Sequence, residues 1–176
     1  MALCKMNDFF DGFKYDKTET CQSPIHKNLF LIDYAVLVKR EGSQTTVQNS
    51  SVIDMDSLKT SLNITPMPKS MDMALIVSKV TNNQKKLRKY ILADFKFKVT
   101  SLDKVDKNVS NDEIKEKFNF SKSYISSVDF TIPCSNIAYF IFKDNNFEQI
   151  KNTWNRRNLN NPKNIAIKQS DFEVIF

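Results

Sequence analysis

The chain has 176 residues, of which 41% are hydrophobic and 26% are charged, so one soluble domain with a sizeable core is expected. Its formal net charge of +6 favours a polyanionic partner. With only two glycines, the chain lacks the glycine-rich loops that cradle phosphates or dinucleotides, and the single histidine, His26, excludes sites that need two histidines. Catalysis by this chain would therefore depend on carboxylates and lysines.

Cysteine spacing and hydropathy indicate the cellular location of the protein. Three widely spaced cysteines form no C-x-x-C pair, and no stretch approaches the roughly 20 apolar residues of a membrane span. The charged N-terminus also lacks the apolar run of a signal peptide. We therefore expect a cytoplasmic protein with reduced thiols and no membrane contact. A homodimer and a complex with another protein both stay open.

The first third of the chain gives mixed signals. Residues 1–28 are expected to form an N-terminal extension, with a short amphipathic segment followed by a polar loop. Residues 28–40 are apolar enough for a buried helix or a buried strand, and their pattern does not separate the two. Residues 52–62 are predicted to be a strand end that turns into a short helix, with Asp54 and Asp56 as capping residues rather than metal ligands.

A β-hairpin is predicted next, from the strand-like runs 72–80 and 87–99 with a turn centred on Asn83 to Lys85. Four more elements are predicted after it. They are a helix at 112–128 with an N-cap in the Ser110 to Asp112 cluster, a buried strand at 136–144, an amphipathic helix at 145–158 and a closing strand at 164–176. This order predicts an α/β fold, a single domain over 1–176 with a mixed sheet flanked by helices.

Side chains alternate along the second strand of the hairpin, which separates two faces. The predicted core face carries Ile91, Ala93, Phe95, Phe97 and Val99, and the other face changes from apolar to charged through Tyr90, Leu92, Asp94, Lys96 and Lys98. The predicted turn places Asp72 opposite Lys96, and Asp94 near Ala74. Asp72, Asp94 and Lys96 would then cluster, although a slip of one residue would move Asp72 to the other face. The alternative is an exposed strand end with weak surface ion pairs.

The succession of Asp72, a hairpin and Asp94-Phe95-Lys96 resembles the PD-(D/E)xK nuclease superfamily of restriction-endonuclease-like folds. "SMDMALIV" stands where that family has an acid opening its second strand, and "ILADFKFKV" stands where it has an apolar run, an acid, any residue and a lysine. The resemblance covers about residues 50–145. Two departures are Met71, which stands where the family has proline, and the lack of a clear first-helix glutamate, for which Glu41 is a loop candidate.

The resemblance implies a Mg²⁺ ion, or Mn²⁺ in its place, held by Asp72, Asp94 and the main-chain carbonyl of Phe95. Lys96 would orient or activate the attacking water, and Lys117 would be the basic residue on the following helix. The implied function is a Mg²⁺-dependent nuclease that hydrolyses DNA phosphodiester bonds. The alternative is a catalytically inactive accessory protein on the same fold that binds nucleic acid or another protein.

Basic residues elsewhere are candidate contacts to DNA. The predicted nucleic-acid-binding residues are Lys85, Lys86, Arg88, Lys98, Lys117, Arg156 and Arg157. The competing interpretation of the basic hairpin tip is a solvated turn. Trp154, next to the two C-terminal arginines, is expected to pack in the core with Phe147 and Ile150, and Phe130 is also expected to be core.

Overall fold

The computed structural model describes residues 10, 12–23, 30–62, 66, 68–81, 85–99, 110–145, 147–157 and 163–176. The interpretation of His26, the centre of the predicted hairpin turn, and the predicted DNA contacts of the Lys85 and Arg157 side chains lie outside what is described. Within the described residues, no helix is long and apolar enough to cross a bilayer.

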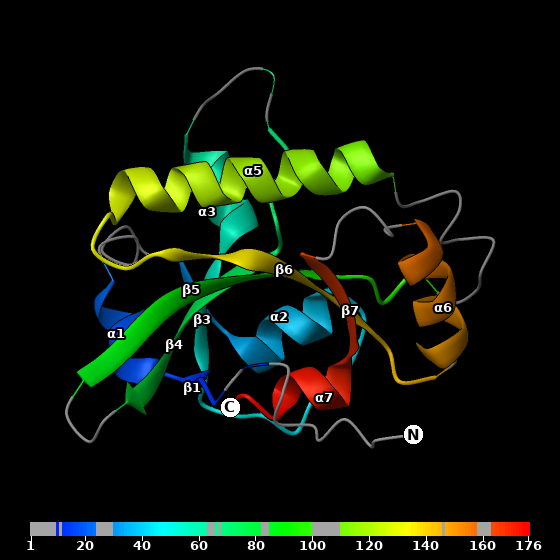
Figure 1. Ribbon diagram of the computed structural model, residues 1–176, viewed down its shortest axis with the longest axis horizontal. Coiled ribbons are helices and arrows are strands. Elements are labelled where there is room, and N and C mark those ends of the chain that lie inside the picture. The colour runs from blue at the N-terminus through cyan, green and yellow to red at the C-terminus, as the bar shows by residue number, and fades with distance from the viewer. Residues whose placement is uncertain are drawn as a thin grey trace.

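The predicted α/β fold with a mixed sheet is confirmed by one seven-stranded sheet (Figure 1). Its main path runs β2 (Leu31–Asp33), β3 (Ser51–Asp54), β4 (Met73–Thr81), β5 (Lys85–Phe95), β6 (Cys134–Phe142) and β7 (Asn164–Lys168), and β1 (Lys14–Tyr15) pairs with β4. Pairing is antiparallel from β2 to β5 and parallel from β5 to β7. The carboxyl ends of β5, β6 and β7 therefore meet at one edge of the sheet.

Helices cover both faces of the sheet (Figure 1). One face packs against α3 (Met55–Ser61), α5 (Asn111–Val128) and α6 (Phe147–Arg157), and the other against α2 (Tyr34–Arg40) and α7 (Gln169–Glu173). The short α1 (Lys17–Gln22) lies against β3 and β4. The sheet is thus the middle layer of three.

Both faces of β5 are buried, whereas the sequence predicted a core on one face only. Tyr90 and Leu92 pack in the core on the α5 side, and Ile91 and Ala93 pack in the core on the α2 side. The strand ends at Phe95, so the alternation does not continue to Val99, which joins the α5-side core. The charged residues that follow Leu92 therefore lie at the end of a buried strand, not along an exposed one.

Two segments, one left open and one predicted as a strand, each hold a strand followed by a helix. Residues 31–33 form β2 and Asp33 then caps α2, because its Oδ1 accepts a hydrogen bond from Ala35 N at 2.9 Å. The predicted closing strand is shorter than expected, since β7 ends at Lys168 and α7 follows directly. By contrast, the strand-to-helix transition at Asp54 and the Ser110 N-cap of α5 are confirmed.

The hairpin register differs from the prediction by two residues. Pairing runs from Thr81 with Lys85 to Met73 with Ala93, and its continuation sets Asp72 beside Asp94 instead of Lys96. A shift of two preserves the face on which a side chain lies, because alternation has a period of two. Asp72 and Asp94 therefore remain on the same face.

Two predictions about aromatic residues have opposite outcomes. Trp154 is 1% exposed and packs with Phe147 and Ile150 against Phe140, as expected. Phe130, however, is 88% exposed, because it follows the end of α5 in the connection to β6 instead of lying within an element.

Candidate active site

Asp72 and Asp94 meet at the edge of the sheet where β4 begins and β5 ends. Asp72 N donates a hydrogen bond to Ala93 O at 3.1 Å, which ties the start of β4 to the neighbouring strand. Phe95 N in turn donates to Asp72 Oδ2 at 2.6 Å. The Asp72 carboxylate is therefore held by the main chain of the residue that separates Asp94 from Lys96.

Asp94 is the centre of an ion-pair cluster. Its side chain is fully buried, and Lys117 from α5 donates to its Oδ1 at 2.8 Å. The Lys96 amine forms an ion pair with the other oxygen, Oδ2. The lysine side chains are only 13% and 17% exposed, so the cluster lies largely out of water.

The two carboxylates differ in how readily they ionise. Burial and the nearby charge of Asp94 raise the pKa of Asp72 well above its ordinary value. Burial also opposes ionisation of Asp94, but Lys96 and Lys117 outweigh it and hold the pKa of Asp94 below the ordinary value. Burial disfavours the charged form of Lys117, yet Asp94 and Asp72 raise the pKa of this lysine. Asp94 thus carries the negative charge, and Asp72 is the carboxyl group that retains a proton more easily.

The cluster opens into a cavity of about 360 Å³, whose lining includes Asp72, Phe95, Lys96 and Lys117. Glu41 lines the same cavity, and its charge contributes to the raised pKa of Asp72. Glu41 reaches the cavity because it follows α2 directly and caps it through its N–H. A third carboxylate is therefore present at the site.

The sequence supported Glu41 only as a loop candidate. The chain reverses after it at Gly42, which has a φ of +90°, a conformation that suits glycine at the end of a helix. This signal identifies the helix end only once residues 34–40 are known to be helical, and their sequence pattern left that open.

Helix α5 supports both carboxylates. Four residues after Lys117, Ser121 lies on the same face of the helix, fully buried. Its hydroxyl accepts a hydrogen bond from Met71 N at 2.9 Å. One helix face therefore binds Asp94 through Lys117 and fixes the residue before Asp72 through Ser121. No motif in the sequence indicates this role of Ser121.

The basic residues at the hairpin tip lie far from this cavity. Lys86 pairs with Asp16 at 2.7 Å, and Arg88 pairs with Glu19 at 2.9 Å, both acids belonging to α1 or its cap. Six residues of extended strand separate Arg88 from Asp94, which corresponds to roughly 20 Å. Direct contact of these side chains with a ligand in the cavity is therefore excluded.

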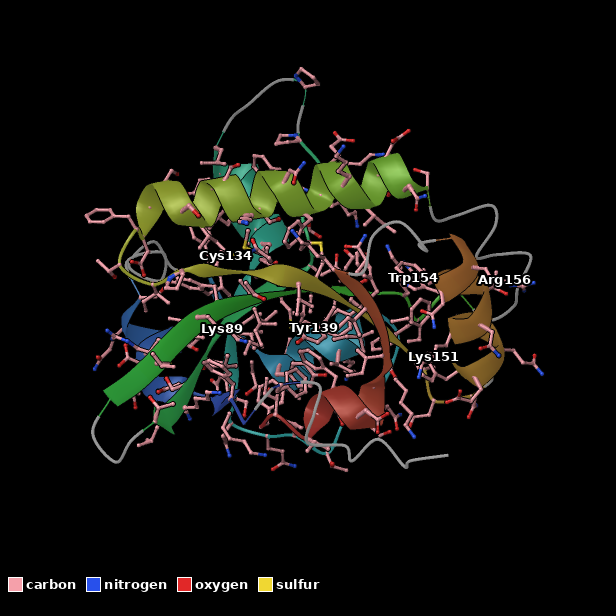
Figure 2. All side chains as sticks on the ribbon, in the orientation of Figure 1. Lys89, Cys134, Tyr139, Lys151, Trp154 and Arg156 are labelled. Carbon is pink, nitrogen blue, oxygen red and sulfur yellow. The ribbon has the colours of Figure 1, made fainter. Side chains whose placement is uncertain are left out.

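The other predicted basic contacts fall in two places. Lys98 is exposed and lines the cavity together with Lys96. Arg156 lies on the outer side of α6, while Trp154 faces the sheet (Figure 2), and Arg156 donates to Thr153 Oγ1 at 3.2 Å. Among the predicted DNA contacts whose side chains are described, Lys98 and Lys117 line the cavity, and Lys117 does so from within the ion-pair cluster.

Among the described residues, no group of three or more histidine, cysteine, aspartate or glutamate side chains is close enough to hold a metal ion. Asp72 and Asp94 supply two carboxylates, and further oxygen ligands would have to come from the main chain, water or a substrate.

Comparison of the chain with protein-family models, with curated proteins and with solved structures finds no match.

Proposed function

We propose that this protein is a Mg²⁺-dependent nuclease that hydrolyses DNA phosphodiester bonds. The observation that carries the proposal is that Asp72 and Lys96, from adjacent ends of β4 and β5, line one cavity, and that the fully buried Asp94 is paired with Lys96 at the same place. The order of elements also supports a restriction-endonuclease-like fold. Asp72 opens the first strand of a central hairpin, Asp94 and Lys96 close the second, and a helix and a buried strand follow.

The chemistry of these residues fits a divalent cation. Two carboxylates side by side in a buried place repel each other, and the raised pKa of Asp72 is a consequence of burial and of that repulsion. The Asp94 Oδ2 atom is buried and paired with the Lys96 amine, so a bound cation would share this oxygen with Lys96. Mg²⁺ prefers such oxygens and keeps several waters when one or two carboxylates hold it.

Each residue has a distinct proposed role. Asp72 and Asp94 would hold the ion with the carbonyl of Phe95, and the Phe95 N–H keeps the Asp72 carboxylate oriented. A bound Mg²⁺ would lower the pKa of a coordinated water and offset the charge of the scissile phosphate. Lys96, next to Asp94, would orient that water and stabilise the negative charge that develops on the phosphate oxygens.

Lys117 would restrain Asp94 from the side of α5, and Glu41 would add negative charge near the ion. The cytoplasmic location and a DNA partner, expected from the sequence, accompany this proposal as predictions.

A specific observation favours the second candidate function, an accessory protein that has lost catalysis and binds nucleic acid or another protein. Two lysines already neutralise Asp94, and the described residues bring no third metal-ligating side chain into position. A site that evolved to remain empty of metal would need such internal neutralisation, since a lone buried carboxylate is costly.

The cleavage of supercoiled plasmid DNA separates the two candidates. We expect the purified protein to nick and then linearise plasmid in Mg²⁺ or Mn²⁺ and to leave it intact in excess EDTA, because the ion supplies the activated water. The Asp72→Asn variant, which keeps an oxygen able to accept from Phe95 N–H, serves as the control for contaminating nucleases. Cleavage of equal extent by this variant would refute the assignment of the site.

A further inference from the structure

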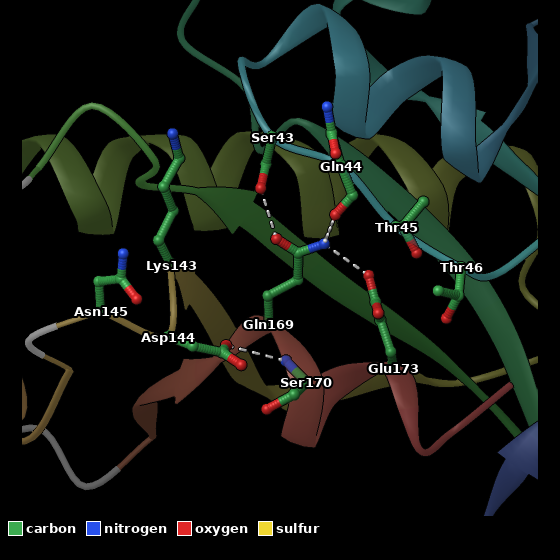
Figure 3. Close-up of a pocket in the computed structure, with 10 residues that line it drawn as sticks. All are labelled: Ser43, Gln44, Thr45, Thr46, Lys143, Asp144, Asn145, Gln169, Ser170 and Glu173. Carbon is green, nitrogen blue, oxygen red and sulfur yellow. Dashed lines mark hydrogen bonds between the residues drawn. The ribbon is translucent and has the colours of Figure 1, made fainter.

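Two further cavities lie beyond the active site, at the edge where the parallel strands end. One has a volume of about 420 Å³ and lies between the loop that follows α2, the end of β6 and the start of α7 (Figure 3). The other has a volume of about 860 Å³. Both are lined by Ser43, Gln44, Thr45 and Lys143, so they form one continuous hollow.

This hollow adjoins the active-site cavity along the chain. Gly42 and Lys39 line the larger part of the hollow, while Glu41, between them in sequence, lines the active-site cavity. At the sheet edge, Lys96 follows β5 and Lys143 follows β6, the next strand. Neighbouring strands lie about 4.8 Å apart, so the edge from β5 to β7 spans roughly 10 Å.

Three basic side chains at or near this edge have no acidic partner among the described residues. Lys39 and Lys143 in the hollow, and Lys98 in the active-site cavity, form no ion pair with a described residue. In Figure 3 the amine of Lys143 extends away from the Asp144 carboxylate. The positive charge of these lysines is therefore available to a ligand.

The two acids that line the smaller cavity are already engaged in internal hydrogen bonds. Asp144 Oδ1 accepts from Ser170 N at 3.2 Å. Glu173 Oε1 accepts from Gln169 Nε2 at 2.7 Å and from the Tyr34 hydroxyl at 3.3 Å. One oxygen of each carboxylate is thus directed at a donor within the protein.

Gln169 fixes the shape of the hollow. It is 7% exposed, accepts a hydrogen bond from the Ser43 hydroxyl at 2.7 Å and donates to Gln44 O at 2.5 Å. The start of α7 and the loop after α2 are thereby joined, as Figure 3 shows. These bonds hold the loop after α2 against the start of α7 and so form one wall of the hollow.

We infer that this hollow, which we name the basic edge track (Lys39, Ser43, Gln44, Thr45 and Lys143), binds the phosphates of the DNA strand next to the scissile phosphate. The inference rests on the proposed function and adds the mode of substrate binding. Lysine amines, hydroxyls and amides are the groups that contact phosphate oxygens in protein–DNA complexes. An edge of roughly 10 Å is long enough to contact the phosphates of neighbouring nucleotides on one strand.

The lining also predicts how the track discriminates between ligands. No aromatic side chain lines either described cavity, so the track offers no surface on which a base can stack. Binding there is expected to depend on backbone charge and to be independent of base sequence. The basic hairpin tip, in which Lys86 and Arg88 already pair with α1, contributes less.

The test measures binding of a short fluorescein-labelled duplex of mixed sequence by anisotropy, in EDTA, over a range of salt concentrations. The Lys39→Gln/Lys143→Gln variant is compared with Lys17→Gln/Lys163→Gln, which removes the same charge from exposed sites outside the track. We expect the first variant to bind at least about tenfold more weakly, with a salt slope lower by about two, one for each lost phosphate contact. The control is expected to keep the wild-type slope.

Equal affinity and equal slope for the two double variants would overturn the inference, and so would absence of DNA binding by the wild type at low salt. The readout needs no metal and no cleavage, so it is separate from the test of the proposed function. Track-dependent binding without plasmid cleavage in Mg²⁺ would retain the inference and refute the nuclease. Plasmid cleavage by the wild type, together with equal DNA binding by the two variants, would refute the inference and retain the nuclease.

Discussion

Replacement of Lys96 by alanine is expected to lower the rate of DNA cleavage by about 10²–10⁴-fold, the usual effect of losing a group that positions or transfers a proton. Of the two lysines at Asp94, Lys96 directly follows β5, the strand that ends with Asp94 and Phe95, whereas Lys117 extends from α5. Binding of DNA should persist, because Lys39, Lys98 and Lys143 are untouched. The measurement is the initial rate of plasmid nicking, with anisotropy as the binding readout.

The control for this experiment is Lys115→Ala, which removes an exposed lysine from α5 and should leave the rate unchanged. The melting temperature of each variant identifies any loss of folded protein, since Lys96→Ala also removes one partner of Asp94. A folded Lys96→Ala protein that cleaves at the wild-type rate would exclude Lys96 from the reaction.

The second large effect is a difference in stability between the two carboxylates. Asp94→Asn should lower the free energy of unfolding by about 3 kcal/mol, because it leaves the largely buried amines of Lys96 and Lys117 without their counter-charge. For a chain of this length, the loss corresponds to a fall in Tm of about 6–12 °C. Addition of Lys117→Met to this variant removes one of the two amines and should recover part of the loss.

In metal-free protein, Asp72→Asn should raise the free energy of unfolding instead of lowering it. The pKa of Asp72 is raised, so the folded state binds more protons than the unfolded state at any pH between the two pKa values. Stability of the wild type then falls as pH rises from about 4, the unfolded value, through the raised folded value. A neutral asparagine removes this loss and retains the acceptor for Phe95 N–H.

Urea denaturation of both variants in EDTA, at mildly acidic and at neutral pH, measures these differences. The expected order of stability at neutral pH is Asp72→Asn at or above the wild type, with Asp94→Asn well below it. Equal destabilisation by the two substitutions would mean that Asp72 is an ordinary structural acid and that the two carboxylates do not repel each other.

The core of the site follows from local pattern, which explains why the sequence identified it. Period-two alternation places Asp94 and Lys96 on one face whatever the tertiary structure, and an antiparallel hairpin brings Asp72 to the same end. The turn position was misjudged by one residue, which shifts the register by two and leaves the face unchanged. An error that shifted the register by one residue would have placed Asp72 on the opposite face of the sheet from Asp94.

Ser121 and Lys143 were missed, and Glu41 was named only as a loop candidate, because tertiary packing decides their roles. Glu41 enters the cavity through the end of a helix that the sequence could not separate from a strand. Ser121 acts through a single main-chain hydrogen bond to Met71, which leaves no compositional trace. Lys143 lies at the same sheet edge as Lys96 because β6 is the parallel neighbour of β5. No single segment of the sequence predicts the order of strands in a sheet.

Exposure was also harder to predict than hydrophobicity. Phe130 is as apolar as Phe140, yet the first lies in a connection and the second in the central sheet. The basic hairpin tip was uncertain for the same reason, since the α1 acids that pair with Lys86 and Arg88 lie far away in sequence.

The central claim is that Asp72 and Asp94 together hold one divalent ion, and thermal unfolding with increasing Mg²⁺ tests it most directly. A ligand of the folded state at ten times its dissociation constant adds about 1.4 kcal/mol, which raises Tm by about 3–5 °C. The account predicts this rise for the wild type, and its absence in Asp72→Asn and in Asp94→Asn. An unchanged wild-type Tm at millimolar Mg²⁺ and Mn²⁺, or an equal rise in all three proteins, would contradict it.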